Sequence, residues 1–421
     1  MPALGSAAPS VHERVARLFF ETDDDLVADP WPLWAQLQEM APVVESGPLY
    51  LVTRFAGVKD VFRRHEVFSS DSRRRGTRTI AFRESLTPER RAAWDEIAEF
   101  HALWMVTTDD PVHARLREVV HRAFTPRRIA LLEQATRQYV DEAIADMAGD
   151  DTVDLMRLAL DVPLFIVTDL LGVPIEDREL IKGYARQWFE FQFVTDDRVF
   201  ISLQAQRNLQ GYVDEMIAAQ RRNPNPTSLV QAFMGAEHEH RLDPREMAAN
   251  FFLFLFAGHE TTTNLIATGM MEVLSRPEQW RRLVDDRTLI PNAIEEMLRY
   301  VTPAQFHNRF VLQDTEIAGT PIPAGATVTT LLAAANRDPD VFQDPQTFDV
   351  ERPDADKHMT FGFGRHFCLG GPLTRLEGNI AVDALARRFP DLELATDTFH
   401  WRGGAQLRGL AELPVHPGRL H

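Results

Sequence analysis

The only cysteine of the chain lies in a glycine-rich loop ahead of a helix-like run. Cys368 is flanked by three glycines within 361–370, and the apolar residues of 372–388 have helical spacing. Glycine lets the backbone approach a flat ligand closely and adopt positive φ. A thiolate near a helix N-terminus is stabilised by the helix dipole and by free backbone N–H groups, which lower its pKa. These are the conditions that a metal-ligating cysteine needs.

Three other interpretations of Cys368 compete with metal ligation. An arbitrary lone cysteine is most often a small buried apolar residue. A Cys-His hydrolase would need a histidine partner, but no further motif supports one, and His366 lies only two residues away. A dinucleotide-binding loop would need a third glycine where Phe367 stands. The neighbourhood of the thiol therefore favours a metal-binding loop.

The loop also resembles a known motif. Residues 361–370 read Phe-Gly-Phe-Gly-Arg-His-Phe-Cys-Leu-Gly and match the haem-binding signature of the cytochrome P-450 family, Phe-Gly-x-Gly-x-His-x-Cys-x-Gly, at all six fixed positions. The resemblance implies that Cys368 ligates the iron of haem b and that His366 contacts a haem propionate. Further motifs extend the resemblance, in order, from about Trp31 to Val415.

A second chemical segment, 257–262, places an acid and two threonines after an apolar run, on a helix expected over about Pro244–Leu274. Threonine hydroxyls compete for backbone carbonyls and can bend a helix, and Gly258 has no side chain to obstruct a ligand. An ordinary helix surface is the alternative. The segment resembles the family's oxygen-activation motif. That resemblance implies a groove for dioxygen, a hydrogen bond from Thr261 to the bound oxygen and a proton relay through Glu260.

A carboxylate and an arginine stand three residues apart in Glu296-Met297-Leu298-Arg299, so both lie on one face of a helix. As a solvated surface pair they would contribute little. They resemble the family's Glu-x-x-Arg pair, which is buried and tied to a later arginine that Arg352 resembles. The resemblance implies that these three residues support the Cys368 loop.

Basic residues recur at positions that resemble the family's propionate contacts. His113 and Arg117 are four residues apart and therefore share a helical face, as they would on any amphipathic helix. Paired cations would offset the cost of placing two carboxylates inside the protein. By resemblance, Arg309 and His366 complete the set.

Segments at 80–104, 187–203, 253–257, 304–307 and 405–407 are expected to line a substrate pocket. They are rich in aromatic residues, which favours an apolar, ring-containing substrate, although each aromatic could equally pack in the core. Three polar residues, Gln305, His307 and Gln406, could anchor an oxygen or nitrogen of the ligand. The candidate pocket residues are Trp104, Leu253, Phe256, Ala257, Gln305, His307 and Gln406.

The elements that must position these groups change in character along the chain. A helix is expected over Trp31–Met40, a strand over 49–53 and mainly helices over 111–288, with breaks near 125–126, 173–174 and 223–226. Short strands and turns follow residue 299. We expect a mainly α (α+β) fold, with residues 1–11 as a flexible tail and 12–421 as one domain. The resemblance implies a large helical lobe and a smaller β-rich lobe with the haem between them.

Composition limits the function classes. The 421 residues carry a net charge of −17, which disfavours binding to nucleic acid, and the single cysteine excludes an intramolecular disulfide. The longest clean apolar stretch, 251–258, is too short to cross a membrane. No signal peptide is evident at the N-terminus. The protein is expected to be a cytoplasmic monomer.

The resemblance implies a monooxygenase that inserts one oxygen atom from O2 into a small, largely apolar organic substrate. Since the chain carries no flavin or iron–sulfur module, electrons would come from a separate ferredoxin and its reductase. We expect a basic docking face for the ferredoxin, made by Arg115, Arg122, Arg127, Arg128, Arg365 and Arg375.

Two alternatives remain. One is a peroxygenase driven by hydrogen peroxide, although such enzymes of the family generally lack the acid–threonine pair at Glu260 and Thr261. The other is a catalytically silent haem-fold protein that activates a partner enzyme. Such relatives typically lose the cysteine or the oxygen-activation residues, which this chain keeps.

Overall fold

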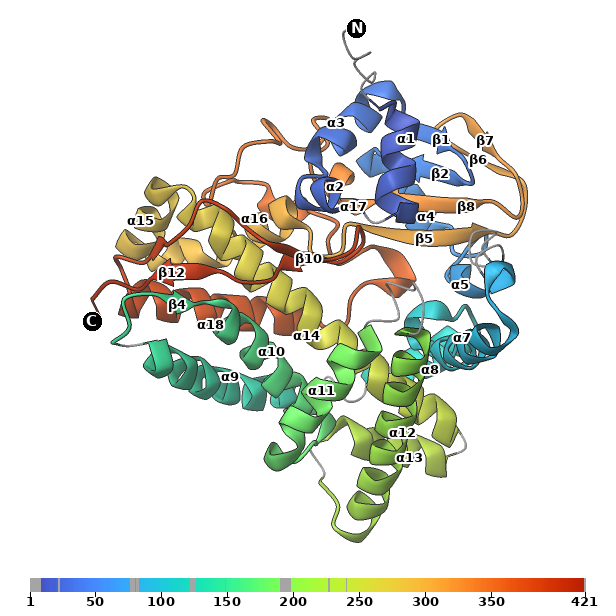
Figure 1. The fold of residues 1–421 in the computed structure, drawn as a ribbon, viewed down its shortest axis with the longest axis horizontal. Coiled ribbons are helices and arrows are strands. Elements are labelled where there is room, and N and C mark those ends of the chain that lie inside the picture. The colour runs from blue at the N-terminus through green and yellow to red at the C-terminus, as the bar shows by residue number, and fades with distance from the viewer. Residues whose placement is uncertain are drawn as a thin grey trace, which may run out of the picture.

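The computed structural model describes residues 9–21, 23–75, 80, 83–121, 126–147, 149–189, 198–225, 228–239 and 241–419 (Figure 1). Helices form most of the described chain, and the largest sheet lies to one side of the helical part of the molecule. The α-helices are α1 Val11–Ala16, α2 Asp24–Ala28, α3 Trp31–Met40, α4 Phe55–Arg63, α5 Ser72–Arg75, α7 Pro88–His101, α8 Val112–His121, α9 Pro126–Met147, α10 Met156–Leu171, α11 Arg178–Phe189, α12 Arg198–Arg222, α13 Leu229–His238, α14 Pro244–Leu274, α15 Pro277–Asp285, α16 Ile290–Val301, α17 Leu332–Ala335 and α18 Gly371–Arg388.

Helix α14 runs through the middle of the helical lobe (Figure 1). It begins at Pro244 because Asp243 caps it: the Asp243 carboxylate accepts from the Glu246 N–H, and the Glu246 side chain accepts from the Asp243 N–H. Beyond the exposed first turn, almost every residue of the helix is buried, apart from the stretch around Ala257 and Thr261. The interior of the central helix therefore has one accessible turn.

The sheets draw on both ends of the sequence. The largest has the order β1-β2-β8-β5-β3, in which β2 and β8 are parallel and the other pairs are antiparallel. Its strands are β1 Val43–Ser46, β2 Leu49–Val52, β3 Phe68–Ser69, β5 Phe306–Val311 and β8 Thr327–Leu331. The remaining strands are β4 Val153–Asp154, β6 Thr315–Ile317, β7 Thr320–Ile322, β9 Glu393–Leu394, β10 Trp401–Gly403, β11 Arg408–Leu410 and β12 Pro414–His416.

The expected organisation is confirmed: a mainly helical lobe carries a smaller sheet-rich part built from distant segments. The first helix begins at the last residue of the expected N-terminal tail, 1–11. Ser10 accepts a hydrogen bond from the Glu13 N–H in a capping box, so α1 already begins at Val11. Residues 1–8 lie outside the described residues. Among the described helices none is long and apolar enough to span a membrane.

Candidate active site

The Cys368 loop is a tight turn that rests on α4. The Cys368 N–H donates to the Phe361 carbonyl at 2.9 Å, which closes the loop. Gly364 has φ of +72°, and a Cβ there would lie 3.0 Å from the Phe62 carbonyl oxygen. A larger residue at 364 would therefore be both strained and crowded, which accounts for this glycine of the motif.

The Cys368 thiol lies in a recess: its side chain is accessible, and yet enough protein surrounds it to desolvate it. Burial raises the pKa of Cys368, opposed by hydrogen bonds from the Gly370 and Gly371 N–H groups and by the charges of Arg117 and Arg375. The groups expected to lower the pKa are present, but the expected net direction is wrong because desolvation outweighs them. A metal cation at the sulfur would reverse the balance, since a coordinating thiol is deprotonated.

Next to this recess, four basic side chains lie close together: His113 and Arg117 of α8, Arg309 of β5 and His366 of the cysteine loop. The His113 and His366 rings lie 4.0 Å apart between centroids. Arg117 donates to the Phe367 carbonyl at 2.8 Å, and the Ser70 hydroxyl lies 3.0 Å from His366 Nε2. The structure thus brings α8 beside the cysteine loop.

The cluster is short of negative charge. Burial and the charge of Arg309 lower the pKa of His366 to about 2, and burial lowers the pKa of Arg309 to about 10. Within the part of the chain that the structure describes, neither Arg117 nor Arg309 forms an ion pair, and the His113 Nδ1 lies 3.7 Å from Asp110. Half-buried arginines of this kind, beside histidine rings that can donate hydrogen bonds, fit an anionic ligand. The residues present therefore fit a haem, with Cys368 as iron ligand and two propionates at the cluster.

The accessible turn of α14 carries the predicted oxygen-activation residues. The Thr261 hydroxyl donates to the Ala257 carbonyl at 2.9 Å, so these two residues, four apart, share the accessible face. The neighbouring Thr262 hydroxyl lies 3.4 Å from that of Thr374, near the start of α18. This turn of α14 therefore lies beside the helix that follows the Cys368 loop.

Gly258 does not make the groove expected from the sequence. A Cβ at this position would lie 2.8 Å from Cγ2 of Val167 in α10, so the missing side chain allows close packing of two helices. The accessible position on this turn is Ala257 instead.

Glu260 is buried and held by a residue that the sequence did not indicate. Arg402 Nη1 lies 2.7 Å from Glu260 Oε1, while His259 Nε2 lies 3.7 Å from Oε2. Arg402 is 142 residues away on β10, and no spacing rule in the sequence could relate the two.

The Glu296–Arg299 pair is fully buried, as the resemblance implied. Arg299 binds both carboxylate oxygens of Glu296, at 2.6 and 2.8 Å, and Arg352 Nε lies 3.1 Å from Oε1. The remaining donors of Arg299 and Arg352 bond to backbone carbonyls between residues 336 and 347. The three residues fix the segment that leads to the cysteine loop.

Two further residues extend this network to the loop. Asn336, whose carbonyl accepts from Arg299, binds the Met359 N–H at 2.7 Å and the Thr360 hydroxyl at 2.9 Å. Glu295 binds Arg375 of α18 at 2.6 and 2.9 Å. Their only sequence signal was proximity to the predicted motifs.

The aromatic candidates of the pocket form a stack against α14. Trp104 lies 5.2 Å from Trp188 and 6.0 Å from Phe256, and Trp188 lies 4.4 Å from Phe256, between ring centroids. Trp104, Leu253 and Phe256 are buried, and Phe256 precedes the accessible Ala257. Phe191 and Phe193, also expected near the pocket, lie outside the described residues.

The three polar anchors have different surroundings. Gln305 is 1% exposed, and its amide bonds to the Val301 and Thr302 carbonyls and to the Trp34 indole. Its expected role as a ligand anchor is contradicted, because these bonds hold it within the protein. Gln406 is half-buried and donates to the Phe306 carbonyl at 3.1 Å. His307 lies near the cation cluster and lowers the pKa of His366.

The expected basic docking face is largely neutralised where it is described. Arg115 binds Glu246, Arg365 binds Asp110 and Arg375 binds Glu295. Arg122 and the side chains of Arg127 and Arg128 lie outside the described residues. Three of the six charges thus have carboxylate partners in the folded chain.

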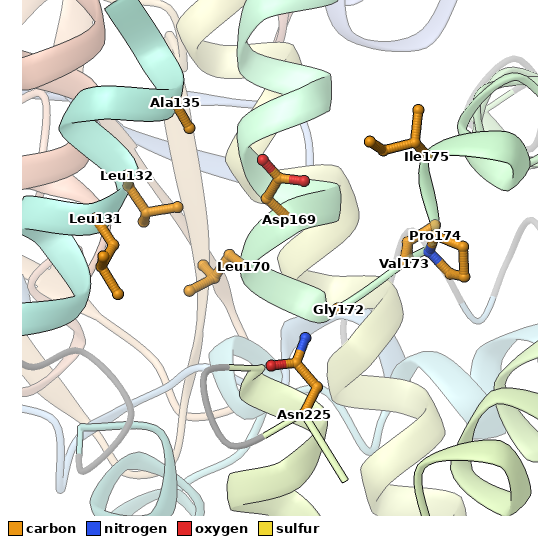
Figure 2. Close-up of a pocket in the computed structure, with 10 residues that line it drawn as sticks. All are labelled: Leu131, Leu132, Ala135, Asp169, Leu170, Gly172, Val173, Pro174, Ile175 and Asn225. Carbon is orange, nitrogen blue, oxygen red and sulfur yellow. The ribbon is translucent and has the colours of Figure 1, made fainter. Parts of the chain in front are cut away.

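A separate surface pocket of about 470 Å³ lies between α9, α10 and the segment that follows α10. Figure 2 shows Leu131 and Leu132 of α9 across from Leu170 of α10, with Asn225 at one side. None of the residues predicted for chemistry lines it, so it is distinct from the Cys368 recess.

Comparison with known proteins agrees with this geometry. The family profile described as Cytochrome P450 matches residues 188–398. The chain is 38% identical over 404 residues to cytochrome P450 monooxygenase PikC of Streptomyces venezuelae, covering 93% of this chain and 92% of that protein. It is 36% identical to vitamin D(3) 25-hydroxylase of Pseudonocardia autotrophica, covering 93% and 94%.

Among solved structures, ligand-free CYP164A2 of Mycobacterium smegmatis superposes with a TM-score of 0.84 at 31% identity, covering 96% of this chain and 100% of that one. Fold, motifs and similarity over nearly the whole length agree. The chain belongs to the cytochrome P450 family, and it is a monooxygenase.

Proposed function

We propose that the protein hydroxylates or epoxidises an apolar, ring-containing organic molecule bound against the accessible turn of α14. The observation that carries the proposal is the exposure of Ala257 and Thr261 on an otherwise buried helix beside the helix of the Cys368 loop. Haem b, when bound, would supply the activation of O2. The protein supplies its ligand, its counter-charges and the proton-handling groups.

Each named residue has one task in this proposal. Cys368 would hold the haem iron, and its thiolate would favour O–O cleavage. His113, Arg117, Arg309 and His366 would hold the two propionates by charge and hydrogen bonding.

The Thr261 hydroxyl donates to the Ala257 carbonyl of its own helix. A rotation of this side chain would let the hydroxyl donate toward the reacting oxygen instead. Glu260 would relay protons to Thr261. Glu296, Arg299 and Arg352 support the loop without touching the reactants.

The aromatic stack supports an apolar substrate. Trp104 and Phe256 cover the side of α14 next to Ala257, and flat side chains favour contact with rings. One relative is named as a hydroxylase of vitamin D(3), itself an apolar molecule. Gln406 and His307 are the remaining candidates for a polar anchor.

Electrons would come from a ferredoxin and its reductase. With Arg115, Arg365 and Arg375 paired internally, docking would depend on the remaining basic residues of this face. Association that is insensitive to salt would contradict an electrostatic docking face.

An optical titration of the ferric protein tests the proposal. A panel of terpenes, steroids, fatty acids, macrolide precursors and aromatic amino-acid derivatives should contain a compound that shifts the haem band from low to high spin. Turnover of that compound with O2, ferredoxin and reductase should give a product carrying one added oxygen. Product from peroxide, and none from O2 with ferredoxin, would establish the peroxygenase instead.

A further inference from the structure

Glu260 has one strong partner, and that partner comes from the C-terminal hairpin. The Glu260 side chain is 8% exposed, and its Oε1 lies 2.7 Å from Arg402 Nη1. Within the described residues this is the only carboxylate that Arg402 contacts. A buried carboxylate in such a pair depends strongly on its partner, because removal of the cation leaves an uncompensated buried charge.

His259 cannot replace Arg402. Its Nδ1 lies 3.0 Å from the Leu255 carbonyl, which can only accept, so Nδ1 carries the proton. Burial lowers the pKa of His259, which disfavours a second proton on Nε2, although Glu260 opposes this. A neutral Nε2 is an acceptor, and it lies 3.7 Å from Glu260 Oε2, too far for a hydrogen bond. Arg402 is therefore the cation that orients the carboxylate, through the ion pair.

The β10–β11 hairpin is built to hold Arg402 in place. Arg402 Nε donates to the Leu410 carbonyl at 2.8 Å across the hairpin. Arg402 pairs directly with Gly409, and a Cβ at Gly409 would lie 2.0 Å from Oδ1 of Asn264. Because Gly409 has no side chain, the hairpin touches α14 one turn beyond Glu260. In Figure 1, β10 crosses close to α14.

The same hairpin reaches the expected substrate side. The Gln305 N–H donates to the Gln406 carbonyl at 2.8 Å, and Ala304 forms a bridge with Leu407. The hairpin turn thus joins the start of β5, while its base holds Arg402. One rigid element links these two regions.

We propose that Arg402 is a positioning residue that fixes the Glu260 carboxylate on the hairpin side of α14. By controlling where Glu260 stands relative to Thr261, Arg402 sets how the consumed electrons divide between product and peroxide. This inference rests on the proposed function of Glu260. Arg402 itself touches neither substrate nor haem in the proposal.

The test uses the holoenzyme with ferredoxin, reductase and a substrate identified by titration. Coupling, the product formed per NAD(P)H consumed, is measured for Arg402→Met, Arg402→Lys, Glu260→Gln and the double variant. Arg402→Met should lower coupling at least about threefold and raise peroxide release, with KM for the substrate changed less than about twofold. Arg402→Lys keeps a cation and should recover most of the coupling.

The double variant separates positioning from general damage to the hairpin. In a Glu260→Gln background, Arg402→Met should change coupling by less than about twofold, because its effect passes through the carboxylate. Full additivity of the two effects, or wild-type coupling in Arg402→Met, would overturn the inference.

His400→Gln is the matched control, since exposed His400 adjoins the same hairpin and, among the described residues, its side chain approaches a carboxylate only at Glu412, at 3.9 Å. It should couple like the wild type. If Glu260→Gln itself couples like the wild type, the proposed function of Glu260 fails, and the role of Arg402 fails with it. If Glu260→Gln lowers coupling and Arg402→Met does not, only the inference about Arg402 fails.

Discussion

Two regions of the molecule hold their buried carboxylates in opposite ways. Around Glu296, the two arginines bind one carboxylate and at least five backbone carbonyls, and all three side chains are at least 94% buried. On α14, Glu260 has one strong partner, and the side chains of Thr263, Asn264 and Thr268 hold buried polar atoms that find none within the described residues.

This difference indicates a structural role for the Glu296 network and a role in the reaction for Glu260. A network with many redundant bonds holds one geometry and cannot easily respond to a substrate. A carboxylate with a single ion-pair partner, next to polar groups with unused hydrogen-bonding capacity, can change partners during a reaction. We therefore expect variants of the first region to change stability and haem retention, and variants of the second to change coupling.

The largest effect is expected for Arg299→Met. The change leaves Glu296 with Arg352 alone in a fully buried position, so the free energy of unfolding should fall by about 3–5 kcal/mol and haem should be lost. Thermal unfolding and haem content measure both. Arg287→Met is the control, because Arg287 forms an exposed pair with Asp383 and should change stability by less than about 1 kcal/mol. Equal losses of stability in Arg299→Met and Arg287→Met would contradict the special role of the buried network.

Thr261→Ala should leave stability nearly unchanged and uncouple the enzyme. Loss of the hydroxyl removes a proton donor at the reacting oxygen, so coupling should fall roughly tenfold while peroxide release rises. Thr262→Val provides the comparison, since the Thr262 hydroxyl faces Gly258 and Thr374 instead. Unchanged coupling in Thr261→Ala would count against its proposed role.

Glu295→Gln tests the structural role of the region around Glu296 through the pH dependence of stability. Although burial alone would raise it, hydrogen bonds from His358 and Arg375 lower the pKa of Glu295 to about 2 from 4.5. Its contribution to stability is therefore fully present above about pH 4.5 and is lost as pH falls toward about 2. At neutral pH the free energy of unfolding of the variant should be about 1 kcal/mol below that of the wild type. On acidification the variant should lose less stability than the wild type does. Parallel stability curves for the two proteins, followed by unfolding, would contradict this.

The smallest effect is expected for Arg365→Gln. Arg365 is half exposed and already paired with Asp110, so ferredoxin affinity should change by less than about twofold at moderate salt. Binding measured over a range of salt concentrations checks this. If the variant binds ferredoxin much more weakly than the wild type at low salt but equally at high salt, Arg365 is part of the docking face.

Local patterns predicted the elements well. The bounds of α3 and α14 agree with the apolar spacing, and the cysteine loop and the Glu296–Arg299 pair each lie within ten or fewer residues of chain. What the sequence could not show depends on contacts between distant segments. Gly258 packs on Val167, Gln305 bonds to the end of α16 and to Trp34, and Arg402 reaches Glu260 from β10.

The central claim is that Cys368 ligates haem iron as a thiolate. The most direct measurement is the absorption spectrum of the reduced carbon monoxide complex, compared between the wild type and Cys368→Ser. The account predicts the thiolate-type haem band in the wild type and its loss in the variant. A wild-type protein that carries no haem, or a thiolate-type band that survives in Cys368→Ser, would contradict it.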